Sequence, residues 1–233
     1  MAVEPSRGGA RILFVTGTDT GVGKTLLTAL LLVHLRERGI CARAMKPVSS
    51  GGREDAKLFF ELLERRVPLD EINPFYFDEP VAPLLAAKRS GRITELGDVL
   101  GAIRSERSQC DYLLVEGAGG LLSPLGKDFS AAELIRELGC SVLVVGKNQL
   151  GVINHVRLTL AVLQIVGATM VKVVLDGCEE ADHSTAANVE LLRNLLHSED
   201  VFTVPFLGHR AAQVQCAKKN SRKLQKILAR ILD

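Results

Sequence analysis

The sequence predicts an α/β fold in which a doubly wound, mostly parallel sheet carries helices on both faces. Short apolar runs alternate with helical patterns along the chain, which is typical of repeated strand–helix units. The first run, residues 12–15, is apolar without interruption, as in a parallel strand buried on both faces. The 233 residues are 47% hydrophobic and contain no linker-like segment. We therefore expect a single domain over residues 11–233 after a flexible tail of residues 1–10.

The elements follow from these patterns in chain order. Strands are expected at residues 12–16, 41–46, 112–116, 141–145, 170–175 and 201–204. Helices are expected at residues 26–38, 54–66, 83–90, 95–105, 131–138, 153–166, 184–196 and 219–232. Gly39 is a natural residue to end the first helix, Ser184 is expected to cap the seventh, and the last carries its apolar residues on one stripe. Residues 47–52 are predicted to be a loop, and residues 67–83, with four prolines, to be mostly irregular.

Composition excludes several classes of function. A formal net charge of +2 gives no reason to expect a nucleic acid or a membrane surface as partner. The most apolar stretch, residues 26–35, is about half of the roughly 20 residues that a membrane span needs. Five scattered cysteines without a Cys-x-x-Cys pair argue for a reducing compartment and against disulfides or zinc. Residues 1–10 lack the apolar core of a signal peptide, so we expect a cytoplasmic protein.

A glycine-rich segment, residues 17–25, joins the first strand to the first helix. It reads Gly-Thr-Asp-Thr-Gly-Val-Gly-Lys-Thr, and strand, glycine loop, Gly-Lys-Thr and helix together predict a P-loop. Backbone N–H groups would close around phosphate oxygens, Lys24 would reach the β- and γ-phosphates, and the Thr25 hydroxyl would bind Mg²⁺. The residues expected to contact the nucleotide here are Thr20, Gly21, Val22, Gly23, Lys24, Thr25 and Leu26. The alternative is a glycine-rich turn that is followed by Gly-Lys-Thr by chance. If the segment is a P-loop, the predicted fold is a three-layer, P-loop NTPase-like domain.

Ligands of such sheets bind beyond the carboxyl ends of the strands, which directs attention to three charged side chains. Lys46 ends the second strand and could steady a transferring phosphoryl group, or it could be a solvated lysine. Asp55 could bind Mg²⁺, or it could only stabilise a helix N-terminus. Glu116 closes an apolar strand and is expected to hold Mg²⁺, because burying an unpaired carboxylate is costly; alternatively it reaches solvent beyond the strand.

Two glycine-containing segments lie at other strand ends. Gly117 and Gly119 follow Glu116 and would let a substrate come close to backbone N–H groups. Gly151 precedes a helix that starts near Val152, which makes an anion site for a substrate carboxylate, or a plain loop-to-helix turn.

Together these segments resemble the dethiobiotin synthetase family. The matching pieces are residues 15–25, Lys46-Pro47-Val48, Asn73-Pro74, Glu79-Pro80, residues 115–120 and residues 150–155, with a weaker match at residues 204–208. The clear pieces span roughly residues 12–155. The P-loop is one residue longer than the common form, and this length is the family's own.

The resemblance implies an ATP-dependent cyclo-ligase of biotin biosynthesis. A diamine, 7,8-diaminononanoate, takes up CO₂ as a carbamate, ATP phosphorylates the carbamate to a mixed anhydride, and the second amine closes the cyclic urea of dethiobiotin. Mg²⁺ would be bound by Thr25, Asp55 and Glu116. Lys46 would stabilise the charge shared by carbamate and γ-phosphate, and Ser50 could donate a hydrogen bond nearby.

The resemblance also implies further binding residues and a partner. The nucleotide would contact Asp176 and the late turn of Pro205, Phe206 and Leu207. The substrate carboxylate would be held by Gly151, Val152, Ile153 and Asn154 of the partner subunit in a homodimer. Asp176 stands where the family often has Asn; a carboxylate accepts hydrogen bonds and cannot donate them, so it suits guanine better than adenine, and the preferred nucleotide could differ from ATP.

Three other classes of protein remain as alternatives. Nucleotide-driven switch ATPases that partition chromosomes or place division sites share this kind of sheet, although their P-loops usually carry an extra lysine, which positions 18–22 lack. An amidoligase of the cobalamin type would need a glutamine-hydrolysing domain that is not evident. The third is a pure nucleotide-binding module.

Overall fold

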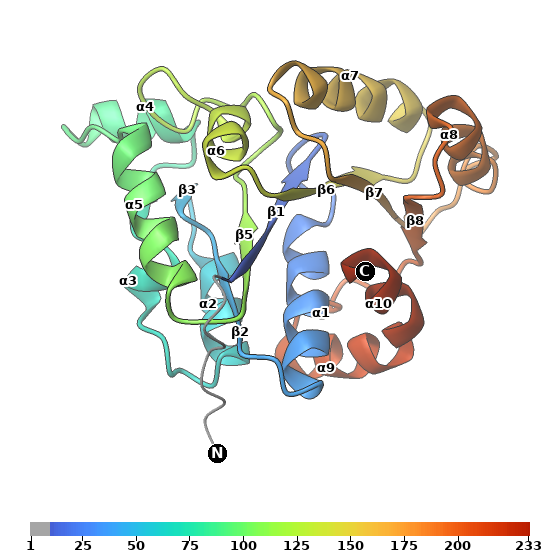
Figure 1. Cartoon of the computed structure of the whole chain (residues 1–233), viewed down its shortest axis with the longest axis horizontal. Coiled ribbons are helices and arrows are strands. Elements are labelled where there is room, and N and C mark those ends of the chain that lie inside the picture. The colour runs from blue at the N-terminus through green and yellow to red at the C-terminus, as the bar shows by residue number, and fades with distance from the viewer. Residues whose placement is uncertain (1–9) are drawn as a thin grey trace.

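The computed structural model describes residues 10–233 and centres on a six-stranded parallel sheet with the strand order β2-β5-β1-β6-β7-β8 (Figure 1). Its strands are β1 (Arg11–Gly17), β2 (Ala42–Met45), β5 (Tyr112–Glu116), β6 (Ser141–Lys147), β7 (Val171–Asp176) and β8 (Val201–Val204). Every pairing in this sheet is parallel. The predicted fold class is confirmed, and each predicted strand is present with its ends shifted by no more than two residues.

Helices cover both faces of the sheet (Figure 1). One face packs against α1 (Lys24–Glu37), α2 (Glu54–Leu62), α9 (Val214–Lys223) and α10 (Gln225–Leu232). The other face packs against α4 (Pro83–Arg89), α5 (Leu96–Arg107), α6 (Ala131–Leu138), α7 (Val152–Ile165) and α8 (Asn188–Leu196). Each face of the sheet has its own hydrophobic core, and successive residues of β1 alternate between them. Val15 belongs to the core on the α1 face, and Phe14 belongs to the core on the α7 face. This alternation is the period of a strand, and it explains why β1 reads as an unbroken apolar run.

Local sequence explains where helices begin and end. α1 lies between the sheet and other helices, so it is buried on more than one side. Ten of its residues are buried, Lys24 and all of residues 27–35, which explains why its apolar residues are not confined to one stripe. α6 begins with a capping box in which Ser130 accepts from the backbone N–H of Ala132 and Glu133 accepts from that of Ser130. It ends at Gly139 in the left-handed conformation.

Two connecting segments contain structure that the sequence patterns did not indicate. Residues 47–52 were predicted to be a loop, but they contain the strand β3 (Val48–Ser50). Residues 67–83 contain the short helix α3 (Leu69–Ile72) and the strand β4 (Phe75–Phe77), which pairs with β3 in parallel. The prolines flank these elements without interrupting them, and the pairing supplies backbone partners that neither three-residue strand could find alone.

Two helix predictions are corrected near the C-terminus. Residues 219–232 do not form one helix; α9 and α10 meet at Leu224, whose N–H bonds to both Asn220 O and Ser221 O. Ser184 does not cap α8, which begins four residues later, because the Asp182 carboxylate accepts from the N–H and hydroxyl of Ser184 and holds that segment as a turn.

The strand order places the functional edge of the sheet. β1 is central, and the chain leaves its carboxyl end between β5 and β6, where the strand order reverses. The carboxyl ends of β2, β5, β6 and β7 lie along the same edge, which is where open parallel sheets bind ligands.

Of the predicted tail, residues 1–9 lie outside the described residues, whereas Ala10 is buried and its carbonyl accepts from Arg107 Nε. Within residues 10–233, no helix combines the length and apolarity needed to cross a membrane.

Candidate functional site

The loop after β1 has the backbone of a phosphate-binding loop. Gly21 and Gly23 have φ values of 73° and 100°, a region that L side chains rarely adopt. The Lys24 ammonium crosses the loop and donates to the backbone carbonyl of Asp19 at 2.7 Å. Burial lowers the pKa of Lys24 to about 8; the charge of Glu116 opposes this shift, and that of Lys46 adds to it. A phosphate beside Lys24 would supply the missing counter-charge.

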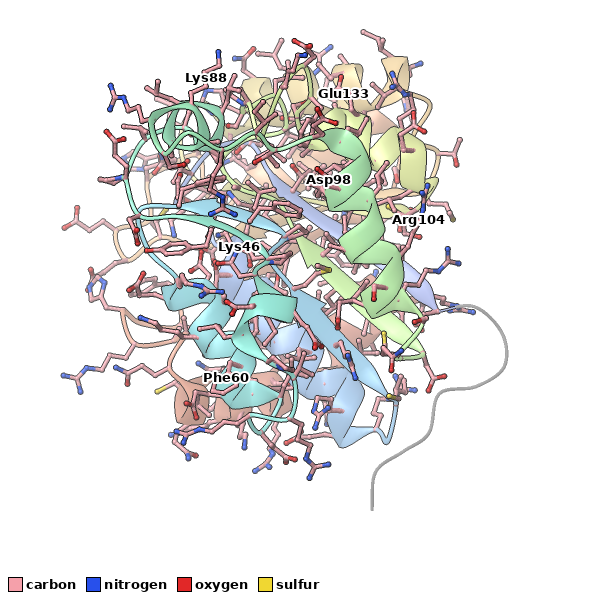
Figure 2. All side chains as sticks on the ribbon, turned by 90° about the vertical axis from the view of Figure 1, so that its left-hand side faces the viewer. Lys46, Phe60, Lys88, Asp98, Arg104 and Glu133 are labelled. Carbon is pink, nitrogen blue, oxygen red and sulfur yellow. The ribbon has the colours of Figure 1, made fainter. Side chains whose placement is uncertain are left out.

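A second charged cluster lies beside this loop and joins three of the predicted site residues. The Lys46 ammonium donates to Glu116 Oε1 at 2.9 Å and forms an ion pair with Asp55. Lys46 is buried, whereas Lys88 and Arg104, which are also labelled in Figure 2, are exposed. Burial acts to lower the pKa of Lys46, but the charges of Glu116 and Asp55 outweigh it and raise this pKa above its ordinary value. The solvated-lysine alternative does not describe Lys46.

The oxygen atoms around Glu116 fit a magnesium ion. Thr25 Oγ1 donates to Glu116 Oε1 at 2.8 Å. Asp55 is paired with the same Lys46 ammonium that donates to Glu116. Glu116 is fully buried, and its Oε2 has no hydrogen-bond partner among residues 10–233. Two carboxylates and a hydroxyl are hard oxygen ligands of the kind that Mg²⁺ prefers. Within the described residues no group of three or more His, Cys, Asp or Glu side chains forms a metal cluster, so this set would rely on Thr25 and on oxygens from a ligand.

Asn73 fixes the position of Lys46 and was not among the predicted site residues. Its buried amide donates to Lys46 O at 2.7 Å, and its Oδ1 accepts from Ser49 Oγ and Arg53 Nε. This network holds the end of β2 against the start of β4. The sequence offered one signal, since Asn73 and Pro74 form one of the matching pieces of the family resemblance.

A third group of residues lies over the helix that follows the P-loop. If Gly23 carried a Cβ, that atom would lie 2.6 Å from Asp176 Oδ2, so the end of β7 is packed directly on the loop. Asp176 accepts from Lys147 Nζ at 2.8 Å. Burial raises the pKa of Asp176, and Lys147 opposes that shift. Lys147 was missed by sequence reasoning: it ends β6, two residues beyond the end of the predicted strand.

The late turn at residues 205–207 joins this third group. A Cβ on Gly177, the residue after Asp176, would lie 2.5 Å from Phe206 N and 2.9 Å from Pro205 C. Gly177 N–H also donates to Val204 O. The structure therefore places Gly23 against Asp176 and Gly177 against Pro205 and Phe206, and Leu26 lines the same small pocket as Gly23 and Asp176.

Other predicted residues have different surroundings. The N–H of Gly117 is bonded to Val15 O, so it is not free to donate to a ligand. Gly119 has φ 67°, and a Cβ there would lie 2.3 Å from Ser123 Oγ, which explains this glycine by packing. Ser50 ends β3 and donates to Val81 O at 2.5 Å. Among the described residues, no hydrogen bond joins Ser50 to Lys46, Glu116 or the P-loop.

The loop between β6 and α7 is held by a polar latch, which we define as Asn148, Asp182, Thr185 and Asn188. The buried side chains of Asn148 and Asn188 bond to each other at 2.9 Å, and Asn148 Nδ2 donates to Thr185 O. Asp182 accepts from the N–H of Leu150 at 2.8 Å. Bonds from Ser184 and from Leu150 N–H lower the pKa of Asp182 to about 2, so this carboxylate stays ionised at neutral pH.

The latch positions the segment of Gly151, Val152, Ile153 and Asn154. Gly151 has φ 95° and lies directly before α7. The N–H of Val152 is bonded to Gln149 O, whereas Ile153 and Asn154 follow in the first turn, where backbone N–H groups have no partner within the helix. Asn154 is exposed, and the exposed side chains of Leu158 and Ile165 follow at helical spacing on the same side of α7. Leu150, which precedes the helix, is 81% exposed.

Comparisons with known proteins identify the family of this chain. A family model described as AAA domain matches residues 11–213. The chain is 38% identical to the ATP-dependent dethiobiotin synthetase BioD of Anaeromyxobacter sp. (strain Fw109-5) over 205 residues, 82% of this chain and 92% of that protein. It is also 38% identical to the protein of the same name from Methanococcus vannielii, over 71% of this chain and 78% of that protein.

Solved structures share the fold at low identity. A plasmid partition protein of Borrelia burgdorferi B31 bound to AMPPNP superposes with a TM-score of 0.62 and 12% identity, covering 96% of this chain and 98% of that one. This likeness concerns the fold alone. The relatives of higher identity therefore decide the family.

Proposed function

The chain belongs to the dethiobiotin synthetase family and is a ligase, and from this premise we propose that it closes the cyclic urea of dethiobiotin from 7,8-diaminononanoate, CO₂ and a nucleoside triphosphate. One amine nitrogen adds to CO₂ and loses a proton to give a carbamate. A carbamate oxygen attacks the γ-phosphorus and displaces the nucleoside diphosphate. The second amine then attacks the carbonyl carbon and releases phosphate, which closes the ring.

The observation that carries this proposal is the ion-paired Lys46 beside a P-loop. Lys24 would hold the β- and γ-phosphates, and the short ion pairs of Lys46 would aim a second ammonium at the charge that develops between the carbamate oxygen and the γ-phosphate. A preorganised cation in a buried site stabilises developing charge far better than one in water. Holding carbamate and phosphate together would supply much of the remaining rate.

We propose Mg²⁺ as the metal, with Thr25, Asp55 and Glu116 as its protein ligands. The buried and unpartnered Glu116 Oε2 supports this set. Mg²⁺ would neutralise charge on the phosphate oxygens. Lys46 donates to Glu116 Oε1, so Mg²⁺ would bind at Oε2, and the ion pairs that aim the Lys46 ammonium would stay in place.

We propose that Gly23, Leu26, Asp176 and residues 205–207 form the base-binding part of the site. The base would meet the Asp176 carboxylate, which accepts hydrogen bonds only. Its partner Lys147 uses the Oδ2 atom, which leaves Oδ1 for a donor on the base. Guanine presents donors in this position, so a preference for GTP or a relaxed choice of nucleotide follows.

We also propose a homodimer in which residues 151–154 of one subunit hold the substrate carboxylate for the other. The exposed apolar side chains of Leu150, Leu158 and Ile165 support an interface along α7, because Asn154 lies on the same side of that helix. A cytoplasmic location is supported by five cysteines that are all free thiols.

The proposal is tested by measuring phosphate release with Mg²⁺, bicarbonate and ATP or GTP, in the presence and absence of the diamine. We expect release that depends on the diamine and rises with bicarbonate. Slow release that the diamine does not accelerate would support a nucleotide-binding module instead.

A further inference from the structure

A cavity of about 560 Å³ lies between the C-terminal end of α1 and the junction of α9 with α10. We call it the α1–α10 cavity. It is lined by His34, Glu37, Arg38, Ser221, Arg222, Gln225, Lys226 and Ala229. The P-loop is at the other end of α1, and 14 helical residues span about 21 Å. Nucleotide and diamine bound at the sheet edge therefore cannot account for the chemistry of this cavity.

The side chains around the cavity carry an excess of positive charge. Glu37 is paired with Arg222, whose Nε lies 2.8 Å from Glu37 Oε1. Arg38 and Lys226 have no carboxylate within ion-pair distance among residues 10–233, although both line the same space. After the paired charges cancel, two cations remain without a protein partner.

Helix ends contribute little to this balance. The C-terminal ends of α1 and α9 and the first residues of α10 border the cavity. Each dipole corresponds to about half a charge, so the two negative ends and the one positive end leave about half a negative charge. The two unpaired cations therefore determine the local field, and it favours an anion.

His34 adds a polar atom that lacks a partner. Its side chain is buried at 7% exposure, and its Nε2 has no hydrogen-bond partner among the described residues. Arg38 lies one helical turn after His34, so both side chains are on the same side of α1. Burial and the charge of Arg38 lower the pKa of His34, and Glu37 opposes that shift. A buried, unpaired ring nitrogen is unusual unless a ligand completes it.

We propose that the α1–α10 cavity binds a small molecule that carries a phosphate group, with Arg38 and Lys226 as its cationic contacts and His34 as a third hydrogen-bonding partner. A guanidinium matches two phosphate oxygens at once, and an ammonium supplies a second charge. The cavity is within the size range of small-molecule sites and has room for more than a free phosphate ion. This site is independent of the proposed synthetase reaction.

The test is calorimetric titration of the full chain with inorganic phosphate while saturating Mg-nucleotide fills the P-loop. We expect one phosphate per chain, and binding weakened at least about tenfold in the double variant Arg38→Gln/Lys226→Gln. The matched control is Lys219→Gln/Lys223→Gln, which removes the same charge from exposed residues of α9 that do not line the cavity. The control should bind phosphate as the unaltered chain does.

A second titration separates phosphate from carboxylate ligands. Malonate, a dicarboxylate of similar charge, should bind more weakly than phosphate and a phosphate monoester more tightly. No phosphate binding, equal binding by the two double variants, or tighter binding of malonate would each overturn the proposal. Melting curves for both variants verify that the fold is intact, since all four substituted side chains are exposed.

Discussion

The Lys46 ammonium lies 2.9 Å from Glu116 Oε1 and is also paired with Asp55. The two carboxylates that are suited to a metal ion are therefore joined by a protein cation. A charge this deeply buried needs a partner, because removing one member of a buried pair typically costs about 3–5 kcal/mol. Lys46 therefore supplies a counter-charge for both carboxylates, and we propose that Mg²⁺ binds at the oxygen atoms that Lys46 leaves free.

Lys46→Ala should abolish turnover while nucleotide affinity stays within about threefold. Lys46 is proposed to act on charge that exists only with the carbamate, so its loss affects the transition state and not the bound nucleotide. Product formation is measured by mass spectrometry and nucleotide binding by calorimetry. Lys57→Ala is the control, because Lys57 is exposed and, within residues 10–233, has an ion pair with Glu54 alone. Normal turnover by Lys46→Ala would remove this role.

The same variant should respond to Mg²⁺ more strongly than the unaltered chain. Without Lys46, Asp55 and Glu116 are unpaired, and a loss of about 3–5 kcal/mol corresponds to a lower melting temperature by roughly 6–20 °C for a chain of this size. Mg²⁺ would replace the missing cation, so melting curves with and without Mg²⁺ should differ more for the variant. Equal Mg²⁺ effects on both proteins would place the metal elsewhere.

Asp176→Asn should shift nucleotide preference toward ATP. The amide adds a donor that the carboxylate lacks, and this donor suits the N7 acceptor of adenine. The ratio of kcat/KM for ATP to that for GTP is expected to rise about tenfold or more. Asp200→Asn removes the same charge from an exposed position at the start of β8 and should leave the ratio unchanged. If Asp176→Asn also leaves it unchanged, Asp176 does not contact the base.

Asp182→Ala should raise the KM for the diamine by several-fold and leave nucleotide affinity unaltered. Its carboxylate holds the N–H of Leu150 and thereby orders residues 151–154, which are proposed to bind the substrate carboxylate. Glu180→Ala is the matched control, since Glu180 is an exposed acid in the same loop. An unchanged KM for the diamine would show that the latch does not position this segment.

Cys110 and Cys140 should resist thiol reagents in the native protein. Burial raises the pKa of Cys110 to about 12 and that of Cys140 to about 11, so neither thiolate forms appreciably at pH 8. Cys41, Cys178 and Cys216 are partly exposed. Ellman's reagent at pH 8 should therefore titrate no more than these three thiols before denaturation and all five afterwards; five fast-reacting native thiols would contradict the packing.

Sequence patterns were sufficient for the main sheet and for the charged groups at its edge. The P-loop, Lys46 and Glu116 each follow an apolar run, and the carboxyl ends of neighbouring parallel strands meet at one edge of a sheet. That rule alone predicted that these residues would converge. The same rule applied to the end of β6 would have found Lys147.

Other features depended on contacts that are distant in sequence. The pairing of β3 with β4 joins two three-residue strands, and neither is long enough to show a period. The latch joins Asn148 to Asn188 across forty positions, and an isolated Asn in a loop carries no signal of its partner. The break at Leu224 arises where α9 and α10 fit around α1, so tertiary packing overrides a continuous helical stripe.

Ring closure is tested most directly by a mass-spectrometric assay with the diamine, labelled bicarbonate, Mg²⁺ and ATP or GTP. We expect a cyclic urea product that contains one labelled carbonyl carbon and forms only when diamine and nucleotide are both present. Absence of this product with either nucleotide, from folded protein that still binds Mg-nucleotide, would contradict the proposed ring-closing activity.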